Sequence, residues 1–532
     1  MNKLRFFLKS QTAVWVLVVV VLAAGYYLRA YFYLNYHYDF SPYDAFWERH
    51  WINVFGISTD VDLFTLKSFS YPLSHILKAA LGVFNQIYWL YFVGALTIFF
   101  LAKEFGNSVW AGILAFLVFT VAPENLIHYT KAISPAGLNY VLSWLSLLFL
   151  FKYLKQPKDL NLVGFIMAAV LAIMSYHTGA SALVVILSGI LLTILIKQDQ
   201  IKTKLIGSFL VILGFYVFWI GMFDVGQISL IKDALLSVKL LIAAIVVLIS
   251  VILLYWSQRI FVHRRFASPV WALGALGLAM FLVFSPFGIF NSLLSLGVDS
   301  YYSSATTLNN YLAQALIVHI YLVMLIPLWS KFDDARKIFV AGWLGGLAVV
   351  FFGLALENYY ARIFDYSFPL MFVLFGYYWT GEKRLRASIV TLTVILLFVS
   401  ELIIFNDPFS LRRYYKPEEV AAAQKIIDYG VGNHTISDLR TSALFYYLGE
   451  SRVRFLDDYF HRIIFYEYQL IKPDIKDRKE KNIYLVIGES MKDIVYGINF
   501  QTTPLDQTFY DYFEENFNLY FDAGDFKVYQ LK

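Results

Sequence analysis

The feature that most constrains this chain is a series of thirteen apolar segments of spanning or near-spanning length. A helix needs about 20 predominantly apolar residues to cross the hydrocarbon core of a bilayer. Hydrophobic residues make up 59% of the 532 positions and charged residues 15%, which excludes an ordinary soluble protein. We therefore predict a polytopic α-helical membrane protein with spans near residues 12–29, 87–102, 108–122, 137–154, 160–174, 178–196, 203–222, 236–256, 269–288, 311–329, 337–356, 363–380 and 387–405.

Basic residues are concentrated on one side of these spans. With the N-terminus inside, the inside loops and the N-terminal segment hold nineteen Lys and Arg, and the short outside loops hold about seven. Cytoplasmic loops carry such an excess, so we predict a cytoplasmic N-terminus and an extracytoplasmic C-terminus. Residues 12–29 are long enough to span and lack a small-residue cleavage site, which favours an uncleaved first span over a signal peptide.

One further apolar segment, residues 71–84, is short and has a polar stripe of Ser74, His75 and Lys78. This spacing predicts an amphipathic helix that lies in the membrane interface. Counting the segment as a span would move two basic clusters to the outside, against the usual charge bias.

Polar residues collect in the predicted outside loops, above all in the first, residues 30–86. Its segment 36–51 places Asp39, Asp44, Glu48, an Arg and two His among aromatic rings. Ionisable groups next to the hydrocarbon region are unfavourable unless they serve a function, so this segment is a candidate site. The alternative is an aromatic interfacial belt, although a belt needs no carboxylates.

Later outside loops add further candidates, each with a structural alternative. Glu124 could instead begin an interfacial helix, where a carboxylate suits the helix dipole. His177 could be a buried histidine bonded to backbone, and Arg362 an anchor that extends to the lipid headgroups. The long polar loop 291–310, with Tyr301 and Tyr302, is typical of a mobile lid or binding element.

The composition changes after residue 405. Residues 406–532 contain 16 Lys or Arg and 20 Asp or Glu, and we predict a separate soluble α/β domain there, after a transmembrane domain of residues 1–405. Pro417 predicts the start of a helix, residues 434–438 and 482–488 predict strands, and 517–521 with 526–531 predict a closing hairpin. The chain has no Cys, which excludes disulfides and thiolate chemistry.

These motifs together resemble the GT-C superfamily, whose multi-span glycosyltransferases use lipid-linked sugar donors. The matching features are the acidic segment Pro42–His50, the Tyr71-Pro-Leu-Ser-His75 segment, Pro123-Glu124, Arg362 at the twelfth span, and an outside C-terminal domain. The sequence departs from the superfamily's oligosaccharyltransferases because their Trp-Trp-Asp-Tyr-Gly motif is replaced by Ile427-Asp428-Tyr429-Gly430, without the Trp pair, on an expected helix end.

The resemblance implies a polyprenyl-phosphate or polyprenyl-diphosphate sugar donor, a protein, lipid or glycan sugar acceptor, and no nucleic acid. It implies an integral protein of a prokaryotic plasma membrane. Asp44 would activate the sugar acceptor, with Asp39 as second choice, and Glu124 would assist or join Asp44 in holding Mg²⁺ or Mn²⁺ if a metal is used. Arg362 would bind the donor phosphate. The other expected donor-binding residues are Tyr71, His75, Lys78, Lys131, His177, Tyr301 and Tyr302.

Two other function classes remain open at this point. A transporter or flippase for lipid-linked sugars would need charged groups within the membrane and usually repeated halves. The sequence offers Lys239, His319 and Glu401, and no repeat is evident. A non-catalytic scaffold that presents the C-terminal domain would leave the acidic first loop unexplained.

Overall fold

The structure is a computed structural model of the chain. It describes residues 15–25, 38–39, 89–121, 135–197, 202–223, 326–329, 331–355 and 361–381, and then 414–430, 432, 434–450, 452–455, 467–477, 482–492, 495–496, 502–503 and 505–532. These residues belong to two compact units, and each unit is described by itself.

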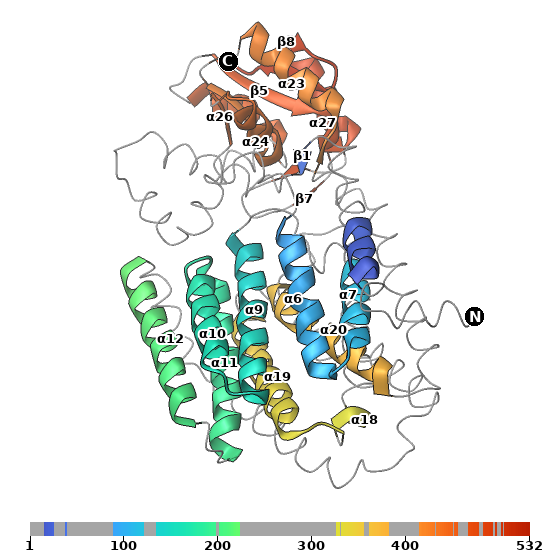
Figure 1. The fold of residues 1–532 in the computed structure, drawn as a ribbon. Coiled ribbons are helices and arrows are strands. Elements are labelled where there is room, and N and C mark those ends of the chain that lie inside the picture. The colour runs from blue at the N-terminus through green and yellow to red at the C-terminus, as the bar shows by residue number, and fades with distance from the viewer. Residues whose placement is uncertain are drawn as a thin grey trace, which may run out of the picture. The chain divides into compact units, whose positions relative to one another are not determined.

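The first unit is a helical bundle, and every predicted span that falls within the described residues is helical. Its elements run side by side in Figure 1. They are Trp15–Gly25, α6 (Trp89–Gly106), α7 (Val109–Val121), α9 (Pro135–Lys155), α10 (Asp159–Ile173), α11 (His177–Lys197), α12 (Lys202–Phe223), α18 (Ile326–Trp329), α19 (Asp334–Ala355) and α20 (Ala361–Gly381).

Two of these helices contain stretches that are long and apolar enough to cross a membrane by themselves, Gly137–Lys155 and Thr203–Met222. Residues 236–256, 269–288 and 387–405 and most of 311–329 lie outside the described residues, so the total of thirteen spans stays a prediction. The interfacial helix expected at residues 71–84 also lies outside them. With the hydropathy of the sequence, this bundle indicates an integral membrane protein.

Glycines allow α11 and α19 to approach closely. A Cβ at Gly342 would lie 2.3 Å from Ile190 Cα, and one at Gly346 would lie 2.4 Å from Ile186 Cα. On the other helix, a Cβ at Gly189 would lie 2.5 Å from the Gly342 carbonyl oxygen. Gly342 and Gly346 have the GxxxG spacing, which is typical of close helix crossings in membranes.

Basic side chains hold the helix ends at the side predicted to be cytoplasmic. Lys155 Nζ donates to the Glu104 carbonyl at 2.7 Å, and Arg336 Nε donates to the Phe105 carbonyl at 2.6 Å. Lys204 Nζ donates to Asp159 at 2.9 Å. The ends of α6 and α9 and the starts of α10, α12 and α19 therefore carry the basic residues, as the charge bias of the sequence predicts.

The second unit contains a five-stranded mixed sheet with strand order β4-β3-β5-β9-β8. The strands are β3 (His434–Ser437), β4 (Val453–Phe455), β5 (Ile483–Gly488), β8 (Asn518–Asp522) and β9 (Phe526–Gln530). β3, β4 and β5 are parallel, and β9 and β8 continue the sheet antiparallel as the predicted hairpin. The helix predicted from Pro417 and the two strands predicted at 434–438 and 482–488 are confirmed, and the structure adds that these strands are parallel.

Helices cover both faces of this sheet (Figure 1). On one face, α26 (Ile471–Asp477) and α27 (Gln507–Asn516) pack on Ile483, Leu485 and Ile487 of β5. On the other, α23 (Pro417–Tyr429) and α24 (Leu439–Tyr447) form a core with Val486. Because side chains alternate along a strand, β5 is buried on both sides.

The short elements of this unit complete it. They are β1 (Tyr38–Asp39), β2 (Tyr414–Tyr415), η5 (Tyr468–Leu470), η6 (Glu489–Lys492), β6 (Val495–Tyr496) and β7 (Thr502–Thr503). β1 comes from the predicted first outside loop, yet it belongs to the unit of the C-terminal residues. The domain limits 1–405 and 406–532 stay a prediction.

Candidate functional site

A buried Asn139 joins four helices of the bundle at the end predicted to face outward. Its Nδ2 donates to the carbonyl oxygens of Ala172 at the end of α10, 2.7 Å away, and Tyr176 before α11, 3.4 Å away. Its Oδ1 accepts a hydrogen bond from the Tyr366 hydroxyl of α20. A Cβ at Gly179 would lie 2.2 Å from Asn139 Oδ1, so only glycine fits there. The amide therefore fixes these helix ends relative to one another.

Two predicted phosphate-binding residues are close in sequence to residues of this junction. His177 is the first residue of α11 and directly follows Tyr176. Arg362 is the second residue of α20, about one helical turn before Tyr366. The starts of α9, α11 and α20 thus lie at one end of the bundle. Helix N-termini present unpaired N–H groups and a partial positive charge, which suits an anion such as phosphate.

The second unit holds the backbone of Asp39, which the sequence predicts as the general base if Asp44 is not. β1 pairs antiparallel with β2, with Tyr38 opposite Tyr415 and Asp39 opposite Tyr414. The buried Tyr415 hydroxyl donates to the Arg440 carbonyl at 2.7 Å. The acidic first loop is therefore tied by main-chain hydrogen bonds to the segment that leads into α23.

Behind β2 lies a buried ion pair that the sequence did not suggest. Arg440 Nη1 and Nη2 donate to Glu419 Oε1 and Oε2, each at 2.8 Å, and Nη1 also donates to Ser490 Oγ at 3.1 Å. The Arg440 guanidinium lies 4.5 Å from the centre of the Tyr415 ring. Both charged side chains are almost fully buried. This network holds β2, and with it β1, against α23 and α24.

The network lies where the parallel strands β3 and β5 end, the side on which open α/β sheets usually bind ligands. Ser437 Oγ donates to the Val486 carbonyl at 2.8 Å, and Asp438 accepts from the Thr441 N–H at 2.8 Å, which caps α24.

Burial, and after it the nearby Glu419 carboxylate, raises the pKa of Asp525. A hydrogen bond from the Arg452 side chain lowers the pKa of Glu450.

The remaining predicted site residues lie outside the described part of the chain. They are Asp44, Glu124, Tyr71, His75, Lys78, Lys131, Tyr301 and Tyr302, together with the transporter candidates Lys239, His319 and Glu401. Among the residues that are described, no group of three His, Asp or Glu side chains could hold a metal ion. The expected metal pair, Asp44 and Glu124, lies outside the described residues and stays a prediction.

Sequence reasoning missed Asn139, Tyr366, Glu419 and Arg440. Asn139 gave a usable signal, because an amide within an apolar span needs partners inside the protein. The ion pair gave none, since Glu419 and Arg440 look like ordinary charges of amphipathic helices. The Ile427–Gly430 segment lies, as expected, at the end of α23, where Gly430 has a φ of +109°.

The sequence matches no family model and no curated protein. Its structure is similar to the archaeal oligosaccharyltransferase AglB from Archaeoglobus fulgidus in complex with an inhibitory peptide and a dolichol-phosphate, with a TM-score of 0.50 and 11% identity over 90% of this chain and 70% of that one. The apo form of the Archaeoglobus fulgidus oligosaccharyltransferase gives a TM-score of 0.51 and 11% identity over 91% of this chain and 70% of that one.

ArnT from Cupriavidus metallidurans, bound to undecaprenyl phosphate, aligns over 98% of this chain and 99% of its own, at 12% identity and a TM-score of 0.41. The two oligosaccharyltransferase structures therefore establish the fold, and the resemblance predicted from the motifs is confirmed at that level. This chain has the fold of the Archaeoglobus fulgidus oligosaccharyltransferase, and that fold is GT-C-like, as the motifs predicted.

Proposed function

We propose that the chain is a membrane glycosyltransferase that moves a sugar from a polyprenyl-phosphate or polyprenyl-diphosphate donor to a sugar acceptor on the extracytoplasmic side. The observation that carries the proposal is the fold, shared with an oligosaccharyltransferase whose structure holds a dolichol-phosphate. The junction at Asn139 supports it, because it gathers three helix starts at the end of the bundle predicted to face outward.

The donor phosphate is assigned to that end of the bundle. Arg362, at the start of α20, supplies a guanidinium whose forked donors match two phosphate oxygens. His177 and the first N–H groups of α11 add positive potential. His75, Lys78 and Lys131 are further cationic candidates, and Tyr71, Tyr301 and Tyr302 are assigned to the donor's sugar and lipid. The polyprenyl chain lies in the bilayer, which is the donor's own environment.

The reaction requires a base for the sugar acceptor. A carboxylate of the first loop, Asp44 first and Asp39 second, takes the proton from the sugar acceptor's nucleophilic group. That group attacks the anomeric carbon, the bond from this carbon to the phosphate oxygen breaks, and the phosphate leaves with the electron pair. Arg362 stabilises the charge that develops on the phosphate.

A metal ion is a separate proposal. Asp44 and Glu124 are the residues that would hold Mg²⁺ or Mn²⁺, since hard cations prefer carboxylate oxygens. A bound ion would supply charge neutralisation at the leaving phosphate. The roles of Asp44 and Arg362 given above do not depend on it.

The test compares two carboxylates of the same loop. The purified full chain, reconstituted with a polyprenyl-phosphate sugar, is assayed for sugar transfer as wild type, Asp44→Asn and the matched control Asp62→Asn. We expect Asp44→Asn to reduce transfer by about 10²-fold or more, as for loss of a general base, with an unchanged melting temperature. Asp62→Asn should retain wild-type transfer.

Full transfer by Asp44→Asn would remove Asp44 from the base role, and Asp39→Asn then becomes the deciding variant. Movement of intact donor across the vesicle membrane without transfer to any sugar acceptor would show a flippase instead of a glycosyltransferase.

A further inference from the structure

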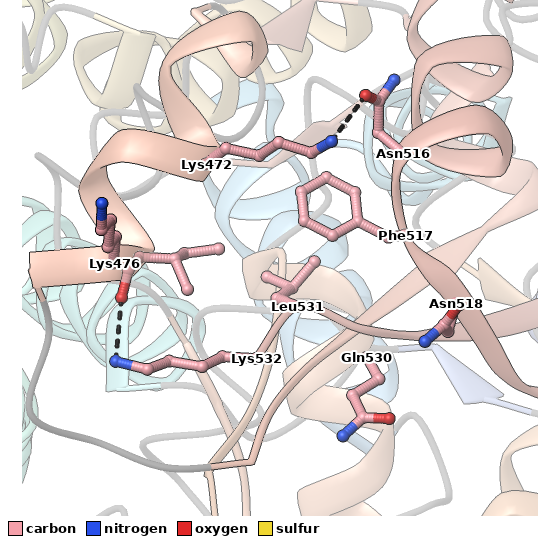
Figure 2. A pocket seen from close by; sticks show the side chains of 9 residues that line it. Lys472, Lys476, Asn516, Phe517, Asn518, Gln530, Leu531 and Lys532 are labelled. Carbon is pink, nitrogen blue, oxygen red and sulfur yellow. Dashed lines mark hydrogen bonds between the residues drawn. The ribbon is translucent and has the colours of Figure 1, made fainter.

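A pocket of about 490 Å³ opens on the second unit, on the α26 and α27 side of the sheet. Figure 2 shows Lys472 and Lys532 extended on opposite sides of the Phe517 ring and Leu531. Its lining residues are Lys472, Ile475, Lys476, Asn516, Phe517, Asn518, Gln530, Leu531 and Lys532. This volume lies within the range of about 300–1,000 Å³ that is typical of small-molecule sites, and the lining combines apolar residues with lysines and amides.

Three of the nine lining side chains are lysines, and none is acidic. This is unusual in a region with more acidic than basic residues. Lys472 Nζ donates to Asn516 Oδ1, a neutral oxygen 2.9 Å away, and lies 5.8 Å from the centre of the Phe517 ring. Lys532 Nζ donates to the Ile475 carbonyl at 3.2 Å. An ammonium group has three donors, so Lys472 retains capacity to bind an anion.

The floor of the pocket is held in place by the core. The Phe517 ring stacks on Phe513 with centroids 5.2 Å apart, and Phe513 and Leu531 are buried in the core of the α26 and α27 face. Phe517 itself is only partly buried, and the exposed side chain of Lys472 lies over its ring. The side-chain amides of Asn518 and Gln530 also line the pocket and offer both donors and acceptors.

We propose that this pocket binds a sugar ring that carries a carboxylate or a phosphate. A partly exposed aromatic ring offers a flat apolar surface to the face of a pyranose, the amides suit its hydroxyls, and the lysines suit its negative group. A bare inorganic anion would not use the Phe517 ring, and a neutral sugar would accept hydrogen bonds from the lysines but gain nothing from their charge. The inference concerns binding by the second unit and stands independently of the proposed transfer reaction.

Binding is measured on the full chain in detergent micelles by saturation-transfer NMR and calorimetry. The probes are D-glucuronate, D-glucose 6-phosphate, D-glucose and inorganic phosphate. At least one of the two anionic sugars should bind about tenfold more tightly than glucose or inorganic phosphate. Glucose has the sugar ring without the negative group, and inorganic phosphate has the negative group without the ring. The tighter of the two identifies the anionic group. Equal binding of glucose or of inorganic phosphate, or no binding by either anionic sugar, would overturn the proposal.

Variants locate the site. Lys472→Gln should weaken binding of the anionic sugar about tenfold and leave glucose binding unchanged. Phe517→Leu should weaken the sugars about fivefold and leave inorganic phosphate unchanged. The matched control is Lys425→Gln, which removes the same charge from an exposed position of α23, on the other face of the sheet. An equal loss in Lys425→Gln would show a general charge effect and reject the pocket. Lys472 is exposed, so its variant tests the site even if Phe517→Leu does not fold.

Discussion

At the residue scale, the ion pair between Arg440 and Glu419 is the feature whose energetics are best defined. The guanidinium and the carboxylate meet in two parallel hydrogen bonds of 2.8 Å, and both side chains are shielded from water. Glu419 also accepts the Lys416 N–H at 2.8 Å at the start of α23. A buried pair contributes little net stability relative to apolar residues, but removal of one partner leaves the other charge buried and unpaired.

We therefore predict that Glu419→Gln destabilises the second unit by roughly 3–5 kcal/mol. Thermal unfolding of the full chain in detergent, followed by circular dichroism, measures this as a lower melting temperature. Glu418→Gln is the matched control, because Glu418 is the exposed neighbour on the same helix. Equal melting temperatures for the two variants would show that the pair does not hold β2 and α23 together.

At the element scale, two kinds of packing govern the bundle. Aromatic rings pack between α6, α7, α9 and α20, whereas the α11–α19 crossing depends on glycines that bring the two backbones together. Lipid provides no hydrophobic driving force between helices, so such close contacts supply much of the association energy. A methyl group at this crossing would press on main-chain atoms, which cannot move aside as a flexible side chain can.

Gly342→Ala should accordingly separate α11 from α19 and lower both the yield of folded protein and its melting temperature. Gly214→Ala, on α12, is the control, because a Cβ at Gly214 would have no atom within 4 Å. We expect the control to match or exceed the wild type, since alanine favours a helix more than glycine does. Size-exclusion chromatography and thermal unfolding compare the two variants; an unaffected Gly342→Ala would contradict the close crossing.

Elements with a local signal could be predicted from the sequence, and elements made by distant partners could not. Pro417 fixed the start of α23, and the apolar run around Ile483 indicated β5, because both depend on neighbouring residues. The hydrogen bond from Tyr366 to Asn139 joins residues far apart in the chain. β1 has only two residues, too few for any periodicity to show, so its pairing with Tyr414 and Tyr415 could not be anticipated.

At the scale of the whole molecule, the orientation in the membrane is the property on which the proposed chemistry depends. The basic helix ends, with Lys155 and Arg336, lie opposite the end that carries Asn139 and the starts of α11 and α20. The positive-inside tendency predicts that the Asn139 end faces the extracytoplasmic side. The C-terminal residues follow on that same side if the predicted spans alternate.

Single cysteines test this orientation without background, because the chain contains no Cys. Gln156→Cys, in the exposed connection between α9 and α10, should react with a membrane-impermeant maleimide only after the cells are permeabilised. Glu515→Cys, on the exposed side of α27, should react in intact cells. The opposite pattern would place the proposed site in the cytoplasm and contradict the use of an outward-facing donor.

The pairing of β1 with β2 can form only late in the synthesis of the chain. Tyr38 leaves the ribosome early, but its strand partner Tyr415 is translated only after the whole helical bundle has been made. At about 5–20 residues per second, Tyr415 is made roughly 20–75 s after Tyr38. Tyr38 and Asp39 therefore reach their paired register only after β2 has been made, and a truncated product that stops before β2 lacks this pairing.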